Sequence, residues 1–142
     1  MTSEQYYVYQ YLSSPKYMTL QIQNKILLHD ELQSCLLPSG IRYDVDKVQT
    51  SPGDTLTDLS ARIIDLEAEI NQMVADKVKR ISEIVYLIDS LEEPEERTVL
   101  TGVFIARMKV EDIAALISCD RSNAYRIRDR GLSHLFPLIC NK

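Results

Sequence analysis

Four arginines crowd a ten-residue stretch near the C-terminus of this 142-residue chain, beside other side chains that hydrogen-bond well. A guanidinium group donates two parallel hydrogen bonds to guanine or to phosphate oxygens, and an asparagine amide pairs with adenine in the same way. The chemistry that this stretch offers is therefore recognition of nucleic acid, with no group suited to bond breaking. The candidate contact residues are Arg121, Ser122, Asn123, Tyr125, Arg126, Arg128 and Arg130.

The distribution of charge singles out the same stretch. The net charge is −5, which by itself argues against a nucleic-acid binder. Residues 1–92 hold 8 Lys/Arg and 14 Asp/Glu, a net −6, whereas residues 93–142 hold 8 Lys/Arg and 7 Asp/Glu, a net +1. Residues 121–130 contain four Arg and one Asp, so the positive charge is concentrated there.

Two short helices, 110–117 and 121–135, are expected to position these side chains. Asp120 is a good N-cap for the second helix, and the turn contains Ser118 where a glycine is usual. The residues at spacings that would lock the two helices together are Ile113, Ala114 or Ala115, Ile117, Cys119, Ala124 and Ile127. The pattern predicts a helix-turn-helix spanning roughly Val110 to Phe136.

In such a motif the start of the second helix enters the major groove of DNA. Arg121, Ser122, Asn123 and Arg126 are then expected at base edges, and Arg128 and Arg130 at phosphates. The alternative is that this Arg-rich helix only presents a solvated face to water.

The first half of the chain is also expected to be helical. Residues 3–12 form a short helix with Ser3 as a candidate N-cap, Ser13-Ser14-Pro15 ends it, and residues 16–37 form a second helix. Pro38-Ser39-Gly40 stops that helix and begins a linker over residues 38–53.

A long helix follows, from Asp54 or Thr55 to about Leu91. Its apolar residues are spaced like a coiled-coil seam, which predicts packing on the N-terminal helices or on a second copy. The first run is Leu56, Leu59, Ile63, Leu66, Ile70 and Met73; the second, shifted by one residue, is Val74, Val78, Ile81, Val85, Ile88 and Leu91. Glu93-Pro94 starts the next helix, 94–107.

Residues 94–136 resemble region four of bacterial sigma factors, through Glu95 to Leu100, Asp112-Ile113-Ala114, Asn123 to Arg126, and Gly131-Leu132. The resemblance implies contacts with an upstream promoter element and with RNA polymerase, with Arg121, Ser122 and Arg126 at bases. The departures are Ser118 at a usual Gly, Ala124 at a usual Val or Ile, and Gly131 at a usual Ala.

Most of the chain also resembles small phage and prophage proteins described as late-transcription regulators or as domains of unknown function. Val48-Gln49-Thr50-Ser51-Pro52 matches a linker segment of that family. The acidic N-terminal half lacks a basic, aromatic surface like that of sigma region two. The resemblance therefore implies an activator or adaptor that holds polymerase at a promoter and does not replace a sigma factor.

Other chemistry has little support. Cys35, Cys119 and Cys140 are widely spaced, His29 and His134 stand alone, and no phosphate loop or hydrolase motif is present. We therefore expect no enzyme activity, no catalytic residue, no cofactor and no metal. The polar N-terminus and the lack of a long apolar run predict no signal peptide and no membrane span, hence a cytoplasmic protein.

The sequence thus predicts an all-α protein in two parts. Residues 1–91 are a helical hairpin or coiled-coil oligomerisation region, and residues 92–142 are a helix-turn-helix domain like sigma region four. The expected function is transcription regulation through double-stranded DNA, as a homodimer joined by the long helix, with RNA polymerase as a partner. The alternatives are a protein-binding module without DNA readout and a packaging factor like a small terminase subunit.

Overall fold

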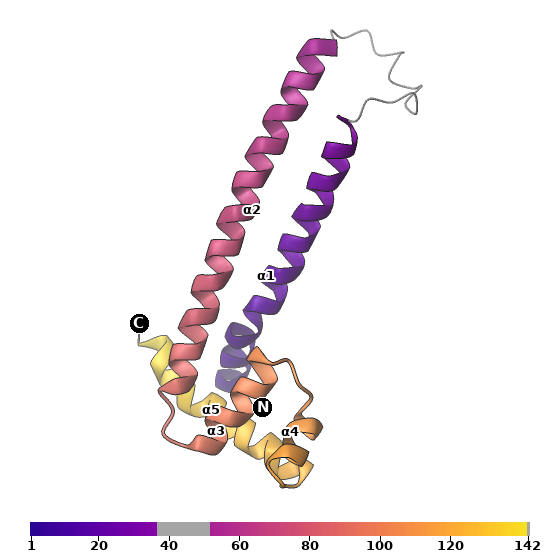
Figure 1. Ribbon diagram of the computed structural model, residues 1–142. Helices are drawn as coiled ribbons and strands as arrows, with labels where there is room; N and C mark the ends of the chain where they lie inside the picture. Colours follow the sequence, from indigo (N-terminus) through magenta and orange to yellow (C-terminus); the bar gives the residue numbers. More distant parts are fainter. Residues whose placement is uncertain (37–51, 142) are drawn as a thin grey trace. The chain divides into compact units, whose positions relative to one another are not determined.

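The computed structural model describes residues 1–36 and 52–141, with the backbone alone for residues 52–54. Helices make up most of the described part, which contains no strand, so the predicted all-α class is confirmed (Figure 1). The elements are α1 (Ser3–Ser34), α2 (Pro52–Asp89), α3 (Pro94–Leu100), the π-helix η2 (Thr101–Ile105), α4 (Val110–Leu116) and α5 (Arg121–Cys140). The linker residues Val48-Gln49-Thr50-Ser51 lie outside the described residues, and Pro52 is the first residue of α2.

Helix α1 runs unbroken through Pro15, so the predicted break at residues 13–15 is wrong. A proline inside a helix leaves the carbonyl four residues earlier without its amide partner. Here that carbonyl belongs to Tyr11, and the Ser14 hydroxyl donates to it at 2.7 Å. The Ser14 oxygen in turn accepts a hydrogen bond from Arg80 Nη1 at 2.8 Å. The neighbouring serine thus supplies the bond that the proline removes.

The start of α1 also differs from the expectation. Thr2, rather than Ser3, caps the helix, because its hydroxyl accepts the amide of Gln5 at 3.2 Å while the Gln5 side chain accepts the amide of Thr2 at 2.9 Å. This reciprocal pair is a capping box. The Gln5 amide nitrogen also donates to the Asp129 carbonyl and to Ser133 Oγ of α5, at 3.1 and 2.8 Å. One side chain therefore both starts α1 and ties it to α5.

The first run of the predicted seam continues along α2 without a shift, and the predicted second run is buried only in part. The buried and half-buried positions of the first run continue in alternating steps of three and four residues: Ile63, Leu66, Ile70, Met73, Lys77, Arg80, Ile84, Leu87 and Leu91. Polar residues occupy two of these positions, which hid the continuous register from a search for apolar residues. In the predicted second run, Val74, Val78 and Val85 are 42%, 58% and 38% exposed, whereas Ile81 is half-buried and Ile88 and Leu91 are buried.

The chain divides into two compact units, each of which takes one part of α1 and one part of α2. The first unit comprises Met1–Tyr17 and Lys77–Lys142, and the second comprises Met18–Asp76. The boundary predicted between residues 91 and 92 stays a prediction. In the second unit the two helical segments run antiparallel and bury Ile22, Ile63 and Leu66, with Lys25 Nζ 3.1 Å from Glu69 Oε1.

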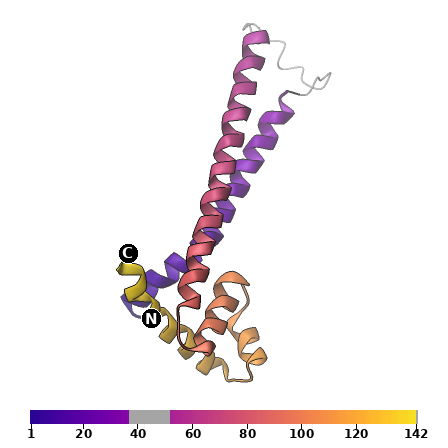
Figure 2. The ribbon, with the colours of Figure 1, turned by 60° about the vertical axis from the view of Figure 1, so that its left-hand side comes forward.

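The main core lies in the first unit and draws on both ends of the sequence. Figure 2 shows the first turns of α1 beside α5 in this unit. Val8 and Leu12 of α1 are at most 1% exposed. The other buried members are Ile84, Leu87, Ile88, Leu91, Leu100, Phe104, Leu132 and Leu135. Tyr7 meets Phe136 edge to face at a centroid distance of 6.1 Å.

Helix α5 extends further than predicted and contains Pro137, which was expected to end it. Gly131 lies in the middle of this helix, where a Cβ atom would be 2.9 Å from Leu100 Cδ1 of α3. Its missing side chain lets α3 and α5 approach closely.

No helix of the described residues is both long enough and apolar enough to cross a membrane.

Candidate nucleic-acid interface

The turn between α4 and α5 has a defined hydrogen-bonded geometry. The amide of Cys119 donates to the carbonyl of Ala114 at 3.0 Å, and the amide of Ser118 donates to that of Ala115 at 3.3 Å. This pair of bonds is the Schellman motif that ends many helices, and it requires a left-handed residue. Ser118 has φ 56°, so the position where the sequence indicated a special backbone does adopt one.

The two helices pack through small and branched apolar residues. Val110, Ala114 and Ala124 form one cluster, with Cys119 against it. Val99 of α3 joins Ile113 and Ile127 in a second cluster, with Ile117 against it. The predicted packing residues of α4 and α5 lie in these two clusters, and Ala124 is fully buried. These contacts fix the direction in which α5 begins.

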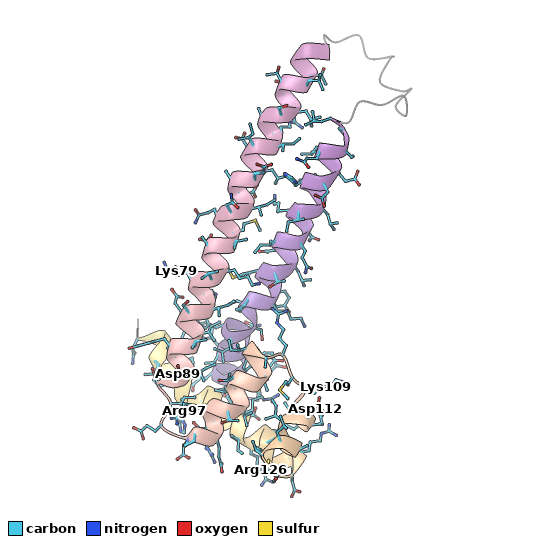
Figure 3. The ribbon with its side chains drawn as sticks, in the orientation of Figure 1. Lys79, Asp89, Arg97, Lys109, Asp112 and Arg126 are labelled. Carbon is cyan, nitrogen blue, oxygen red and sulfur yellow. The ribbon has the colours of Figure 1, made fainter. Side chains whose placement is uncertain are left out.

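The first turns of α5 present four of the predicted contact residues to solvent: Arg121, Ser122, Asn123 and Arg126. Asp120 has extended angles, φ −71° and ψ 149°, as an N-cap should, although its side chain makes no capping hydrogen bond. Ser122, Asn123 and Arg126 line a shallow hollow that also includes Ser118, Cys119 and Asp120. Figure 3 labels Arg126 on α5.

Arg121 and Tyr125 share one acceptor on α4. Arg121 Nε lies 3.2 Å from Glu111 Oε1, and the Tyr125 hydroxyl donates to the same oxygen at 3.1 Å. A hydrogen bond with its own backbone amide lowers the pKa of Glu111, and the Tyr125 hydrogen bond and the charge of Arg121 lower it further. Glu111 is therefore a carboxylate at neutral pH, and it holds Arg121 over the Tyr125 ring at 5.7 Å.

Arg128 points into the unit rather than outward. Its side chain is 14% exposed, and its Nε and Nη2 donate to Asp129 Oδ1 at 2.9 and 2.8 Å. The guanidinium also lies 4.9 Å from the ring centroid of Tyr125 and 5.9 Å from that of Tyr9 in α1. Arg128 thus links α1 to α5 as part of the packing.

Arg130 is tied to a buried carboxylate. Glu96 of α3 is fully buried, and its two oxygens accept Arg130 Nε at 2.8 Å and pair with His134 Nδ1 at 2.9 Å. The hydrogen bond with Glu96 raises the pKa of Arg130 above its usual value. Both partners are about half exposed, so water solvates their outer sides. The sequence analysis missed Glu96 because an acidic residue in the first turn of a helix is ordinary.

The four arginines of residues 121–130 therefore differ in what they can offer. Arg121, Arg128 and Arg130 each have an acidic partner at 3.2 Å or less. Within the described part of the chain, Arg126 is the one of the four with no acidic partner within 4.0 Å. The exposed, hydrogen-bonding surface at the start of α5 consists of Ser122, Asn123 and Arg126, with Arg121 beside them.

The described residues contain no group of three or more His, Cys, Asp or Glu that could hold a metal ion. A comparison with protein-family models matches residues 36–135 to a family described as a protein of unknown function (DUF1492). No curated protein and no solved structure matches the chain. The matched residues include α2, α3, α4 and α5 as far as Leu135.

Proposed function

The chain belongs to this family of proteins of unknown function, DUF1492, and from its own residues we propose that it binds double-stranded DNA and regulates transcription. The observation that carries the proposal is the pairing of α4 with α5 across the left-handed turn at Ser118. This arrangement fits a helix-turn-helix, in which the first turns of the second helix enter the major groove. Those turns carry exposed Ser122, Asn123 and Arg126.

Each of these side chains suits a base edge. Arg126 can donate two hydrogen bonds to guanine O6 and N7, and Asn123 can pair with adenine N6 and N7. Ser122 can serve either base. Arg121, held by Glu111, is oriented before DNA arrives, so it loses little side-chain freedom on binding. Readout of two or three adjacent base pairs by one copy follows from this arrangement.

We expect the electrostatic attraction between one copy of the protein and the DNA phosphates to contribute little to the binding affinity. Arg128 and Arg130 are engaged by Asp129 and Glu96, so they add little positive charge for phosphates. Each neutralised phosphate steepens the dependence of log K on log salt by about 0.9. We expect a slope shallower than about −3 for one copy, and useful affinity then requires a second copy or a protein partner.

A homodimer and RNA polymerase are the partners that fit the proposal. Two-fold symmetric DNA binders double their contacts on a palindromic site. The resemblance of residues 94–136 to sigma region four favours a contact with polymerase, and with it the role of an activator or adaptor. The same internal pairing of arginines favours a second candidate, a protein-binding module that does not read DNA.

Selection of bound sequences from a random DNA pool, followed by affinity measurements, tests the proposal. We expect an enriched motif, and we expect Arg126→Ala to weaken binding to it by about 10- to 100-fold and to relax one base position. Arg121→Ala together with Arg126→Ala should abolish discrete binding at promoters in the host. Arg62→Ala, at an exposed arginine of α2, is the matched control and should leave binding unchanged.

A measurement of stability shows whether a variant loses affinity because a DNA contact is missing or because the protein is unfolded. Arg126 makes no ion pair in the described residues, so Arg126→Ala should keep the wild-type unfolding midpoint. Absence of any enriched motif, or equal affinity of the Arg126→Ala protein for that motif, would overturn DNA readout. Capture of RNA polymerase without DNA, in the same preparations, would then support the protein-binding module.

A further inference from the structure

A cleft between α1 and η2 lies apart from the surface proposed for DNA. Its volume is about 500 Å³, and it shares no lining residue with the hollow at the start of α5. Both of its walls belong to the first unit, since Tyr9 and Tyr17 come from α1 and Phe104 comes from η2. The size is within the range of pockets that hold small molecules or single anchor side chains.

The floor of this cleft is apolar and firmly packed. Leu12 is 1% exposed and Phe104 is 9% exposed. Tyr9 meets Phe104 edge to face, with centroids 5.2 Å apart, so the ring positions are fixed before anything binds. Tyr17, which is 62% exposed, forms a wall that reaches into solvent. An inserted apolar side chain would lose water against this floor without any rearrangement of the core.

The rim is cationic in an otherwise acidic protein. Among the described residues, Lys16 and Arg107 line the cleft and no carboxylate does. Arg107 holds a left-handed backbone, φ 56°, at the turn after η2. Glycine would adopt that conformation without strain, and strained non-glycine residues cluster at ligand-binding places. The π-helix η2 itself is of a rare type that is found often at functional sites.

We propose that this cleft binds an acidic segment of a partner protein, with one aromatic or aliphatic side chain in the cleft and flanking carboxylates on Lys16 and Arg107. The apolar floor matches the anchor, and the charge of the rim matches the carboxylates. Single-stranded nucleic acid fits less well, because bases stack on exposed rings. Of the described aromatic rings along the cleft, only that of Tyr17 is largely exposed. The proposal does not depend on DNA binding by α5.

The test uses a fluorescein-labelled peptide with one Phe between pairs of Asp, titrated with the full-length protein and followed by anisotropy. We expect saturable binding that Lys16→Glu weakens by about five- to tenfold, since the change removes one attraction and adds one repulsion at a solvated site. Lys79→Glu, at an exposed lysine of α2 that does not line the cleft, should change the affinity less than about twofold (Figure 3).

Two further arms distinguish the anchor from simple charge attraction. Tyr17→Ala removes the exposed wall and leaves the buried floor intact, so it should weaken the peptide while the unfolding midpoint stays the same. A peptide with Lys in place of Asp should not bind. Saturation by the Lys peptide, equal affinity of the Lys16→Glu protein, or tighter binding of a labelled thymidine oligonucleotide at the same cleft would each overturn the proposal.

Discussion

Ser118 holds the turn between α4 and α5 in a conformation that disfavours every residue except glycine and, to a lesser degree, asparagine and aspartate. Its φ of 56° costs an ordinary residue about 1–2 kcal/mol, and the turn keeps it because two backbone hydrogen bonds depend on it. Ser118 lines the same hollow as exposed Ser122 and Asn123. A serine here exchanges stability for a polar group next to the proposed DNA surface.

Ser118→Gly should therefore stabilise the protein by about 0.5–1 kcal/mol, because the relief of backbone strain exceeds the entropy that glycine adds to the unfolded chain. Urea unfolding followed by circular dichroism measures the difference. Ser82→Gly, at an exposed helical position of α2, is the control and should destabilise by about 0.5–1 kcal/mol. A lower midpoint for Ser118→Gly would contradict the argument.

His29 makes the stability of the second unit depend on pH. Its Nε2 lies 2.9 Å from Glu67 Oε1, and this hydrogen bond raises the pKa of His29 above 6.5. Because folding raises the pKa, the contribution to stability is complete below pH 6.5 and disappears as the pH rises through the raised value. The melting temperature should therefore fall as the pH rises from 6.5 through the raised pKa of His29.

The variant His29→Gln keeps a polar side chain but cannot titrate, so its melting temperature should vary less over the same interval. Glu67→Gln removes the main cause of the raised pKa and should have the same effect. Thermal unfolding at a series of pH values, at constant ionic strength, provides the measurement. An unchanged pH profile in both variants would show that another group carries the dependence.

At the scale of elements, η2 and α4 of the first unit lie so close together at Gly102 that a side chain there would meet Ile113. A Cβ at Gly102 of η2 would lie 2.6 Å from Ile113 Cδ1 of α4. Gly102→Ala should destabilise by about 1–3 kcal/mol, because Ile113 must leave its position to make room. Ile113→Val, which removes the Cδ1 atom, should cost about 0.5–1.5 kcal/mol alone.

The two changes together should cost less than the sum of the single costs, because the shortened side chain makes room for the new methyl group. Denaturant unfolding of all four proteins completes the cycle. Additive costs within error would mean that η2 and α4 do not meet through this pair. The same cycle applied to DNA affinity would report whether the spacing of η2 and α4 affects the direction of α5.

Sequence patterns predicted the elements that begin with strong local signals. Glu93-Pro94 and Asp120 mark the starts of α3 and α5, and the packing residues of α4 and α5 follow from helical spacing. The predictions failed where a residue far away in the sequence determines the local structure. Pro15 is accommodated by a hydroxyl beside it and by Arg80, which is 66 residues away from that serine, and no local pattern reports such a contact.

In the candidate interface, too, the exposure of residues could be predicted from the sequence, whereas contacts between helices could not. The exposure of Ser122, Asn123 and Arg126 follows from their places on an amphipathic helix. The partners of Arg121 and Arg130 come from other helices, Glu111 and Glu96, so their pairing could not be predicted. The seam of α2 was misjudged because Lys77 and Arg80 occupy positions where an apolar residue was sought.

At the scale of the whole molecule, the exposed valines of α2 bear on the proposed homodimer. Val78 and Val85 are one heptad apart and are 58% and 38% exposed, with half-buried Ile81 between them. A second copy packed along this face would cover them in the manner of a coiled coil. We expect the mass measured by light scattering to be that of a dimer at micromolar concentration.

The substitutions Val78→Glu and Val85→Glu together should give a monomer, because two buried carboxylates on each helix would repel each other and lose water. Lys79→Glu, on the same helix but off this face, should leave the mass unchanged. Helical content should stay constant in all three proteins, since both valines face solvent within one copy. A dimer that survives the double substitution would place the interface elsewhere.

The core of the first unit, assembled from the two ends of the sequence, has a consequence for synthesis. Val8 and Leu12 emerge from the ribosome early, whereas Leu132 and Leu135, which share their core, emerge more than a hundred residues later. Contacts so distant in sequence form slowly, and until then the early apolar residues stay exposed to other chains. The nascent chain cannot complete this core until Leu135 has been translated, so a product that is truncated within α5 before this residue contains an incomplete unit rather than a smaller functional one.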